Sequence, residues 1–506
     1  MPSTTAAMSL DKLTRIALVV SVVLLGLRLT TAEVIGFGDA EALYATYALF
    51  GQATYLDHPG LLGWVGATLA GASGVPSPVT VHRWTAVAAT SIPWLAGLAA
   101  RGAGAPWRGV LCLVLAMSLV PELAVGLFAF APDVPLAVFW LGALGSAAVA
   151  LRAEAGSARA LAGTLAAGMC TALACLSKVS GVLLGLGLLA TWLSKPVRPR
   201  LRTVAPYAAL LAGLMVVVPA LRREGSLGFP MLHHRLLNSQ AGFGPSLRNL
   251  GGLVGGQLLY LTPVVAVVVV LIAIDLARRF RDDAVSRLLF FTTFIPFGVL
   301  AALTVLSRVA EPHWVAPAYL ALGIHFARRT DQATALVSRK WGRAALVTSA
   351  VGVALVFAVV HFPVIPKVLG ARYKPKYDLV NDLYAWQTAA PVVRQAVHNV
   401  QRAGIFDVSV VGPHWVICAQ VQAALGREAR VGCQTPQGDD FGTAYPESRW
   451  QKSPVIVYVT DDRFDVDVSK RFPDRALQSV DRVGVRRGGQ LVRTIRVMVL
   501  GRAARV

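Results

Sequence analysis

Residues 160–193 read ALAGTLAAGMCTALACLSKVSGVLLGLGLLATWL, and Lys178 is the only charged residue among them. As one helix this stretch would measure about 50 Å, far more than the hydrocarbon core of a bilayer, which is about 30 Å thick. We therefore predict a hairpin of two short membrane-spanning helices that turns near Ser177 and Lys178. The hairpin determines on which side of the membrane every later loop lies.

The composition is that of a membrane protein. Of the 506 residues, 55% are hydrophobic and 15% are charged, whereas a soluble protein of this size has about 25% charged residues. The net charge of +21 raises the question of nucleic-acid binding. However, the Lys and Arg residues lie mainly between apolar runs and form no single basic stripe. We interpret them as orientation signals and phosphate contacts, and expect no nucleic acid as a partner.

Apolar runs that are long enough to cross a bilayer recur along residues 1–362. With the hairpin counted as two helices, they predict about eleven crossings. Lys12 and Arg15 precede the first run and no small-residue cleavage site follows it, so we expect a retained first span. The runs lie at about 13–32, 79–100, 109–130, 134–151, 160–193, 203–221, 251–277, 286–306, 313–327 and 344–362.

Basic residues in the loops predict the orientation, because cytoplasmic loops of membrane proteins are enriched in Lys and Arg. Loops 194–202, 278–287 and 328–343 contain thirteen basic residues and are predicted to lie inside. Loops 222–250 and 307–312 contain five and are predicted to lie outside. The first loop, about 31–78, contains no Lys or Arg and is also expected outside.

The composition changes after Pro363. Residues 363–506 are polar, with short β-branched runs at 406–411 and 455–459 and a helical stretch at about 414–426 that ends at Gly426. This pattern predicts a small soluble α/β domain, and an odd number of crossings places it outside. The predicted fold is thus a polytopic α-helical membrane domain, residues 1–362, followed by a C-terminal periplasmic α/β domain, residues 363–506.

The five cysteines fall into two groups. Cys112, Cys170 and Cys175 lie in apolar runs, where a thiol behaves as a small hydrophobic group. Cys418 and Cys433 lie in the polar C-terminal region and can form a disulfide if that region is exported, although spacing alone does not establish the bond.

Most of the remaining ionisable residues collect at the predicted outer face. Acidic and histidine residues were not used to assign the topology, so their positions are an independent observation. Ionisable groups near apolar spans are costly and are therefore candidates for function. The residues in question are Asp39, Glu41, Asp57, His58, His82, Arg83, Glu122, Asp133, Lys178, His233, His234, Arg235, Glu311 and His313.

This mixture of residue types suits the transfer of a sugar from a lipid-phosphate carrier. Asp39 or Glu41 can remove a proton from an acceptor hydroxyl or amine. Arg83, Lys178 and Arg235 can hold a phosphate and stabilise the charge that develops on it as it leaves. The remaining candidates for substrate binding are Asp57, His58, Asp133, His234 and His313.

Structural roles compete with these functional ones. Asp39 and Glu41 point in different directions on a helix, so only one need be catalytic, and either can cap the helix that starts there. Asp133 is favourable at a helix N-terminus in any case, and Lys178 can extend its amine to the membrane surface. Asp57 with a histidine can also bind a divalent metal ion, although two ligands are weak support for a metal site.

Five segments carry a resemblance to a known family. They are GDAEALYATYALFGQATYLDHPGLLGW (38–64), APDVPLAVFW (131–140), LSKVSGVLL (176–184), FPMLHHRL (229–236) and EPHWVAPAYLAL (311–322). In this order they resemble the bacterial dolichyl-phosphate-mannose–protein mannosyltransferase family, which includes the aminoarabinose transferases of lipid A. The resemblance covers about 30–330, and the C-terminal domain matches only vaguely.

The resemblance implies a GT-C fold and an inverting transfer from a polyprenyl-phosphate sugar, with an acid of the first loop as base. One departure concerns that acid. Counting back from Asp57, the family's acidic pair falls on Ala40 and Glu41, so Asp39 is displaced by one residue, about 100° on a helix. The choice between Asp39 and Glu41 therefore stays open. Aminoarabinose transferases have Glu-Lys-Pro where this chain has Asp57-His58-Pro59, so no donor preference is implied.

We expect a lipid-phosphate-sugar-dependent glycosyltransferase of a bacterial inner membrane, active on the periplasmic side. Its partners would be membrane lipids, a polyprenyl-phosphate-linked sugar donor, and a glycan, lipid or protein acceptor. One alternative is a lipid or polysaccharide transporter without catalysis, although transporters more often place charges at mid-membrane within an internal repeat. Another is a ligase or polymerase for lipid-linked glycans, which would use a diphosphate-linked oligosaccharide.

Overall fold

The computed structural model describes residues 8–238, 244–307, 311–330, 339–435, 438–464 and 466–503. The chain forms two compact units. The first consists of Met1–Arg28, Asp57–Leu61 and Thr85–Val356. The second consists of Leu29–Leu56, Leu62–Trp84 and Phe357–Val506. The predicted boundary at residue 362 follows the change in composition and remains a proposal for the end of the membrane part.

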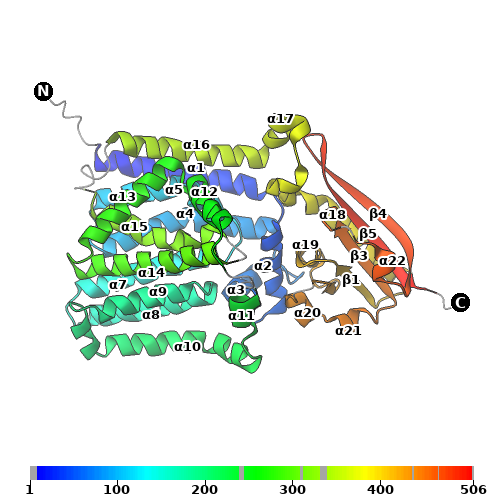
Figure 1. Cartoon of the computed structure of the whole chain (residues 1–506), viewed down its shortest axis with the longest axis horizontal. Coiled ribbons are helices and arrows are strands. Elements are labelled where there is room, and N and C mark those ends of the chain that lie inside the picture. Colours follow the sequence, from blue (N-terminus) through cyan, green and yellow to red (C-terminus); the bar gives the residue numbers. More distant parts are fainter. Residues whose placement is uncertain are drawn as a thin grey trace. The chain divides into compact units, whose positions relative to one another are not determined.

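Long apolar helices dominate the first unit, and Figure 1 shows many of them running side by side. Six helices of the described chain are long and apolar enough to cross a membrane, or up to eight if each of two bent pairs is one span. The protein is therefore a multi-pass membrane protein, and the number of about eleven crossings stays a prediction. The six are α1 (Leu10–Ala32), α7 (Asp133–Arg152), α8 (Ala158–Ser177), α10 (Ala205–Ser226), α14 (Ala284–Leu306) and α16 (Arg339–His361).

The predicted turn at Ser177 and Lys178 is confirmed, because α8 ends at Ser177 and α9 (Gly181–Leu193) begins three residues after Lys178. That α9 crosses the membrane stays a prediction. Two other apolar runs are not single straight spans, contrary to the prediction. The run at 251–277 breaks at Thr262, where α12 (Leu247–Leu261) and α13 (Pro263–Arg279) meet at 103°. Pro263 lacks the N–H that would continue the helix, and Thr262 has a φ of 69°.

The run at 109–130 breaks in the same way. The helix α5 (Trp107–Leu119) is followed by α6 (Pro121–Val125) and η1 (Gly126–Phe128), and the direction changes by 73°. Pro121 again begins the second piece. The other elements of the membrane part are α4 (Pro78–Gly102), η2 (Arg198–Arg202), α11 (Pro230–His233), η3 (His234–Asn238), η4 (Pro312–Val315) and α15 (Ala316–Arg328).

Small residues let α8 pack closely between α7 and α10. A Cβ atom on Gly163 would lie 2.9 Å from the carbonyl oxygen of Ser146 on α7. One on Gly168 would lie 2.7 Å from the carbonyl oxygen of Ala209 on α10. Such close approach through small residues is typical of helices packed in membranes. It fixes the end of α8, and with it the turn that carries Lys178.

The second unit contains the predicted α/β domain. Its five-stranded sheet has the order β2-β1-β3-β5-β4. The strand β1 (Val408–Gly412) pairs in parallel with β2 (Val431–Cys433) and β3 (Val455–Asp461). The strands β4 (Arg475–Arg487) and β5 (Gln490–Arg502) add an antiparallel hairpin to β3. The helices α18 (Asp382–Arg402) and α19 (Trp415–Leu425) pack on the sheet, and α19 ends before Gly426, as predicted.

The remaining elements of this unit are short. They are α17 (Val364–Leu369), η6 (Gly370–Arg372), η7 (Pro375–Tyr377), η8 (Leu379–Asn381), α20 (Asp440–Ala444), α21 (Glu447–Trp450) and α22 (Val468–Arg471). A disulfide joins Cys418 on α19 to Cys433 at the end of β2, which is the pair considered from the sequence.

Part of the first loop folds onto the C-terminal sheet domain. Its helix α2 (Asp39–Phe50) packs against α19, and α3 (Leu61–Leu69) follows it in the chain. Gln420 of α19 donates a hydrogen bond to the carbonyl oxygen of Phe37 at 3.0 Å. The carboxylate of Asp440 accepts one from the backbone N–H of Leu56 at 3.0 Å. The position of α2 is therefore set by residues nearly 400 positions later in the chain.

Candidate functional site

In the first unit, three other predicted site residues lie around Asp57. The Nη2 atom of Arg235 lies 3.2 Å from Oδ1 of Asp57, and its Nε donates to the Asp57 carbonyl oxygen at 2.8 Å. The Nε2 atom of His234 lies 3.6 Å from the same carboxylate. Arg235 also contacts Nε2 of His58 at 3.3 Å. Residues that are 177 positions apart thus form one polar cluster.

The backbone around His234 and Arg235 is unusual. The two residues begin the π-helical turn η3, directly after the short helix α11. Phe229, which precedes α11, has a φ of 59°, a conformation that residues other than glycine rarely adopt. π-helical turns occur frequently at functional sites. Here the turn lets two successive side chains reach Asp57.

Lys178 and Asp133 form a second ion pair in the same unit. The Nζ atom of Lys178 lies 2.9 and 3.0 Å from the two carboxylate oxygens of Asp133. Lys178 occupies the turn after α8, and Asp133 is the first residue of α7. Both side chains are largely buried, with 13% and 25% of their surface exposed. His313, in η4, lies with Nδ1 3.8 Å from Oε2 of Glu311.

The two ion pairs lie within electrostatic reach of His58. Burial, together with the charges of Arg235 and Lys178, lowers the pKa of His58 to about 3. Its imidazole is therefore neutral at ordinary pH. A guanidinium can only donate, so Nε2 of His58 is the acceptor in the contact with Arg235.

Asp57 is ionised. Burial alone would raise the pKa of its carboxyl group, but the contact with His234 and the charge of Arg235 lower the pKa to about 2. The cluster therefore brings together two cations, Lys178 and Arg235, each held by its own carboxylate. Held in this way, both cations are oriented before any ligand arrives.

The predicted residues Asp39, Glu41, His82 and Arg83 belong to the second unit. Asp39 and Glu41 lie in the first turn of α2 and point in different directions, as the helix geometry predicts. One oxygen of Asp39 lies 2.6 Å from Nη1 of Arg463, and the other accepts from Nε2 of Gln420 at 3.3 Å. About a fifth of the Asp39 side chain, 18%, is exposed.

Glu41 is more enclosed than Asp39, with 10% of its side chain exposed. Its Oε2 atom accepts the backbone N–H of Gly38 at 2.7 Å, which caps the start of α2. Its Oε1 atom lies 3.0 Å from Nε2 of His82, a buried residue of α4. Both oxygens of Glu41 are thus held by the surrounding structure.

Arg83 follows His82 in the chain but is exposed. Its Nε atom lies 2.7 Å from the carboxylate of Glu33, and the two side chains are 60% and 49% exposed. A pair with this exposure contributes little to stability. Arg83 stays a predicted phosphate contact and carries no part of the clusters described above.

Arg463 was not predicted from the sequence. Its Nε atom lies 2.8 Å from Asp461, and its Nη1 atom lies 3.6 Å from Asp382. Burial alone would lower the pKa of Arg463, but Asp39, Asp461 and Asp382 together raise it. One signal was present, because charged residues directly follow β3, and ligands of α/β sheets bind at the carboxyl ends of strands.

The chain is similar in sequence and in structure to known proteins. Residues 57–222 match the sequence model of the dolichyl-phosphate-mannose-protein mannosyltransferase family. The structure is similar to that of ArnT from Cupriavidus metallidurans bound to undecaprenyl phosphate, with 16% identity, a TM-score of 0.60, and coverage of 96% of this chain and 97% of that one.

This chain has a GT-C fold. The expected resemblance to the mannosyltransferase-like GT-C family is thereby confirmed. The apo structure of the same ArnT gives the same identity and TM-score, 16% and 0.60, and covers 96% of this chain and 98% of that one. An oligosaccharyltransferase from Archaeoglobus fulgidus gives 13% identity and a TM-score of 0.48, with 87% of this chain and 67% of that chain covered. No curated protein sequence matches the chain significantly.

In this GT-C protein the matched range begins at Asp57 and includes the motifs at 131–140 and 176–184. It therefore contains the Lys178–Asp133 pair. Asp39 and Glu41 of the first loop, and the later motifs that carry Arg235 and His313, lie outside the matched range.

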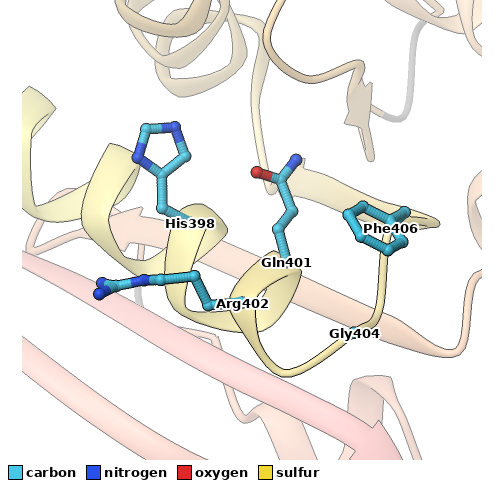
Figure 2. A pocket seen from close by; sticks show the side chains of 5 residues that line it. All are labelled: His398, Gln401, Arg402, Gly404 and Phe406. Carbon is cyan, nitrogen blue, oxygen red and sulfur yellow. The ribbon is translucent and has the colours of Figure 1, made fainter.

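The described residues contain no group of three or more His, Cys, Asp or Glu residues that could hold a metal ion. A shallow hollow lies elsewhere, at the end of α18. Figure 2 shows it lined by His398, Gln401, Arg402, Gly404 and Phe406. It contains no carboxylate and none of the predicted site residues, and we assign it no role.

Proposed function

We propose that this GT-C protein transfers a sugar from a polyprenyl-phosphate carrier to an acceptor, by a single displacement that inverts the anomeric carbon. The observation that carries the proposal is the cluster around Lys178 and Arg235, two buried or half-buried cations each oriented by a carboxylate. The matched family is described by its use of dolichyl-phosphate-mannose, and the similar ArnT structure contains undecaprenyl phosphate. Both support a lipid-phosphate donor.

Lys178 and Arg235 are assigned to the phosphate of the donor. An ammonium group has three N–H bonds, and the contacts of Lys178 with Asp133 leave at least one of them for a phosphate oxygen. When the glycosidic bond breaks, negative charge develops on that phosphate. Cations that are already in place stabilise this charge without reorganisation, which is the largest contribution that such a site makes to rate.

Asp39 is assigned as the general base, with Glu41 as the residue that positions α2. Both oxygens of Glu41 are committed, one to the cap of α2 and one to His82. Asp39 is more exposed, and Arg463 and Gln420 fix its orientation. A base in this role removes the proton of an acceptor hydroxyl or amine while the acceptor oxygen or nitrogen attacks the anomeric carbon. Such general-base catalysis contributes roughly 10²–10⁴-fold to the rate.

The proposed location is a bacterial inner membrane, with the C-terminal domain in the periplasm. The disulfide between Cys418 and Cys433 supports it, because disulfides persist in oxidising compartments and are rare in the cytosol. The thirteen basic residues in loops 194–202, 278–287 and 328–343 support the same orientation.

The test is turnover of defined donors by the purified protein in detergent. Undecaprenyl-phosphate mannose and undecaprenyl-phosphate glucose are each incubated with the protein, and released or transferred sugar is measured. A diphosphate-linked oligosaccharide serves as the comparison. Release from the monophosphate donors supports the proposal. Turnover of the diphosphate donor alone would favour a ligase, and no turnover of any donor would favour a transporter.

A further inference from the structure

The sheet of the second unit has a topological switch point between β1 and β3. The chain leaves β1, passes through α19 to β2 on one side, and returns to β3 on the other side of β1. All three strands are parallel, so their carboxyl ends share one edge of the sheet. Ligands of open α/β sheets bind in the crevice outside these ends, at the switch point.

A pocket of about 590 Å³ lies at this place, a volume within the usual range of ligand sites. Each of the three parallel strands contributes to it through the residues that follow its end. His414 comes after β1, Gln434 after β2, and Phe464 after β3. Tyr458 of β3 and the cations Lys470 and Arg471 also line the pocket.

The lining offers aromatic and hydrogen-bonding surface. The rings of His414 and Phe464 are stacked, with centroids 4.8 Å apart and planes at 21°. The buried hydroxyl of Tyr458 donates to Oε1 of Gln434 at 3.2 Å, which fixes the amide. A pyranose ring has an apolar face and a rim of hydroxyls, and this lining matches both.

Among the described residues that line the pocket, the two cations Lys470 and Arg471 outnumber the one carboxylate, Asp467. Lys470 lies 3.6 Å from Asp467, so these two charges offset one another. Asp467 is the only acidic residue among the described lining residues, and it pairs with Lys470 and not with Arg471. A planar guanidinium binds phosphate and carboxylate groups through two parallel hydrogen bonds. The pocket therefore favours a ligand that carries an anionic group.

The pocket adjoins the ion pair of the predicted base. Arg463 contacts the carboxylate of Asp39 and also lies over the ring of Phe464, 5.9 Å from its centroid. Burial and the charge of Arg463 lower the pKa of His414, and Asp39 is among the carboxylates that oppose this shift. His414 therefore lies within electrostatic reach of Asp39.

We infer that this pocket binds an anionic sugar, a pyranose that carries a phosphate or a carboxylate group, and that this sugar belongs to the acceptor. The second part rests on the proposed function. A phosphorylated sugar and a uronic acid share the chemistry that the pocket recognises, and direct binding measurements distinguish them.

The experiment is isothermal titration calorimetry of the full-length protein in detergent, without any donor. The probes are glucose 6-phosphate and glucuronate, with glucose and inorganic phosphate as controls. At least one anionic sugar is expected to bind, and glucose and inorganic phosphate each to bind at least tenfold more weakly. The tighter of the two sugars identifies the anionic group. Equal binding of glucose or of phosphate, or no binding of either sugar, would overturn the inference.

The variant Arg471→Gln is expected to weaken binding of the anionic sugar at least tenfold, and Tyr458→Phe by a smaller factor. Arg471 is exposed, so its replacement leaves the fold intact. The matched control is Arg482→Gln, which removes the same group from an exposed position on β4 and should leave binding unchanged. Wild-type affinity in Arg471→Gln would contradict the assignment of the anion to this pocket.

Donor turnover separates this inference from the proposed function. Hydrolysis of undecaprenyl-phosphate mannose by water needs no acceptor and should be the same in wild type and Arg471→Gln. Transfer to the tighter-binding anionic sugar should fall at least tenfold in the variant. Binding without any turnover would refute the proposed function and leave the pocket standing. Donor turnover without binding of the anionic sugars would refute the inference about the pocket and leave the proposed function standing.

Discussion

The Nη1 atom of Arg463 lies 2.6 Å from a carboxylate oxygen of Asp39, a residue 424 positions earlier in the chain. The pair joins the first turn of α2 to the turn that follows β3. Asp461 and Asp382 share the same guanidinium. The orientation of the predicted base is thus set by the C-terminal domain, which gives this domain a part in the proposed chemistry.

We expect Arg463→Gln to destabilise the second unit by roughly 3 kcal/mol, because the largely buried Asp39 loses its cation and Asp461 keeps only the more distant Arg493, at 3.9 Å. The measurement is thermal unfolding in detergent, where the midpoint should fall by several degrees. Asp39→Asn should lower the free energy of unfolding less in this variant than in wild type, because the effects of substitutions at two contacting residues are not additive. Strict additivity, or a midpoint equal to that of the exposed control Arg482→Gln, would contradict the ion-pair network.

Lys178→Gln should lower kcat/KM for an undecaprenyl-phosphate sugar by about 10²–10³-fold, since it removes one donor to the leaving phosphate. Lys178→Arg keeps the positive charge, so its kcat/KM should fall less than that of Lys178→Gln. The control is Lys340→Gln at the start of α16, in a predicted basic loop, which should match wild type. A Lys178→Gln variant within threefold of wild type would remove this residue from the phosphate site.

Acidification should destabilise the protein through His58. The imidazole binds a proton with a pKa of about 3 in the folded chain and near 6.5 otherwise, so below pH 6.5 protonation favours the unfolded chain. Lowering the pH from 7 to 5 should therefore reduce the free energy of unfolding by about 2 kcal/mol. The midpoint of thermal unfolding should fall over this interval in wild type and in the exposed-site control His398→Gln. It should fall less in His58→Gln, and an equal fall in that variant would refute the burial of a neutral His58.

The disulfide should stabilise the C-terminal domain. It closes a loop with a sequence separation of 15, for which the chain-entropy account gives about 3 kcal/mol. Dithiothreitol should therefore lower the unfolding midpoint of wild type and of the control Cys170→Ala. It should have no effect on the double variant Cys418→Ala/Cys433→Ala, whose midpoint is already low. An unchanged wild-type midpoint under reductant would argue that the bond does not form in the protein.

Local patterns predicted much of the fold. The length of the run at 160–193 gave the hairpin at Lys178, and β-branched runs gave β1 and β3. Proline marked the two breaks that hydrophobicity alone missed, at Pro121 and Pro263. An apolar run looks the same whether its helix is straight or broken, because both kinds of segment are buried in lipid or protein.

The sequence predicted which residues belong to the candidate site more readily than which of them are in contact. Motif positions named Asp57, Arg235, Lys178 and Asp133, and the structure pairs them. Arg463 could not be found in this way. Its partner Asp39 lies 424 residues earlier in the chain. No local sequence pattern indicates that a turn after a strand will contact the start of a helix so far away.

The most direct test of the central claim is turnover of undecaprenyl-phosphate mannose by wild type, Asp39→Asn and Glu41→Gln, with donor binding measured in parallel. We expect Asp39→Asn to lose roughly 10²–10⁴-fold in kcat while it still binds donor. Glu41→Gln should lose less than tenfold in kcat and unfold at a lower temperature, because it weakens the cap of α2. Full activity in Asp39→Asn, or loss of turnover only in Glu41→Gln, would contradict the assignment of Asp39 as the base.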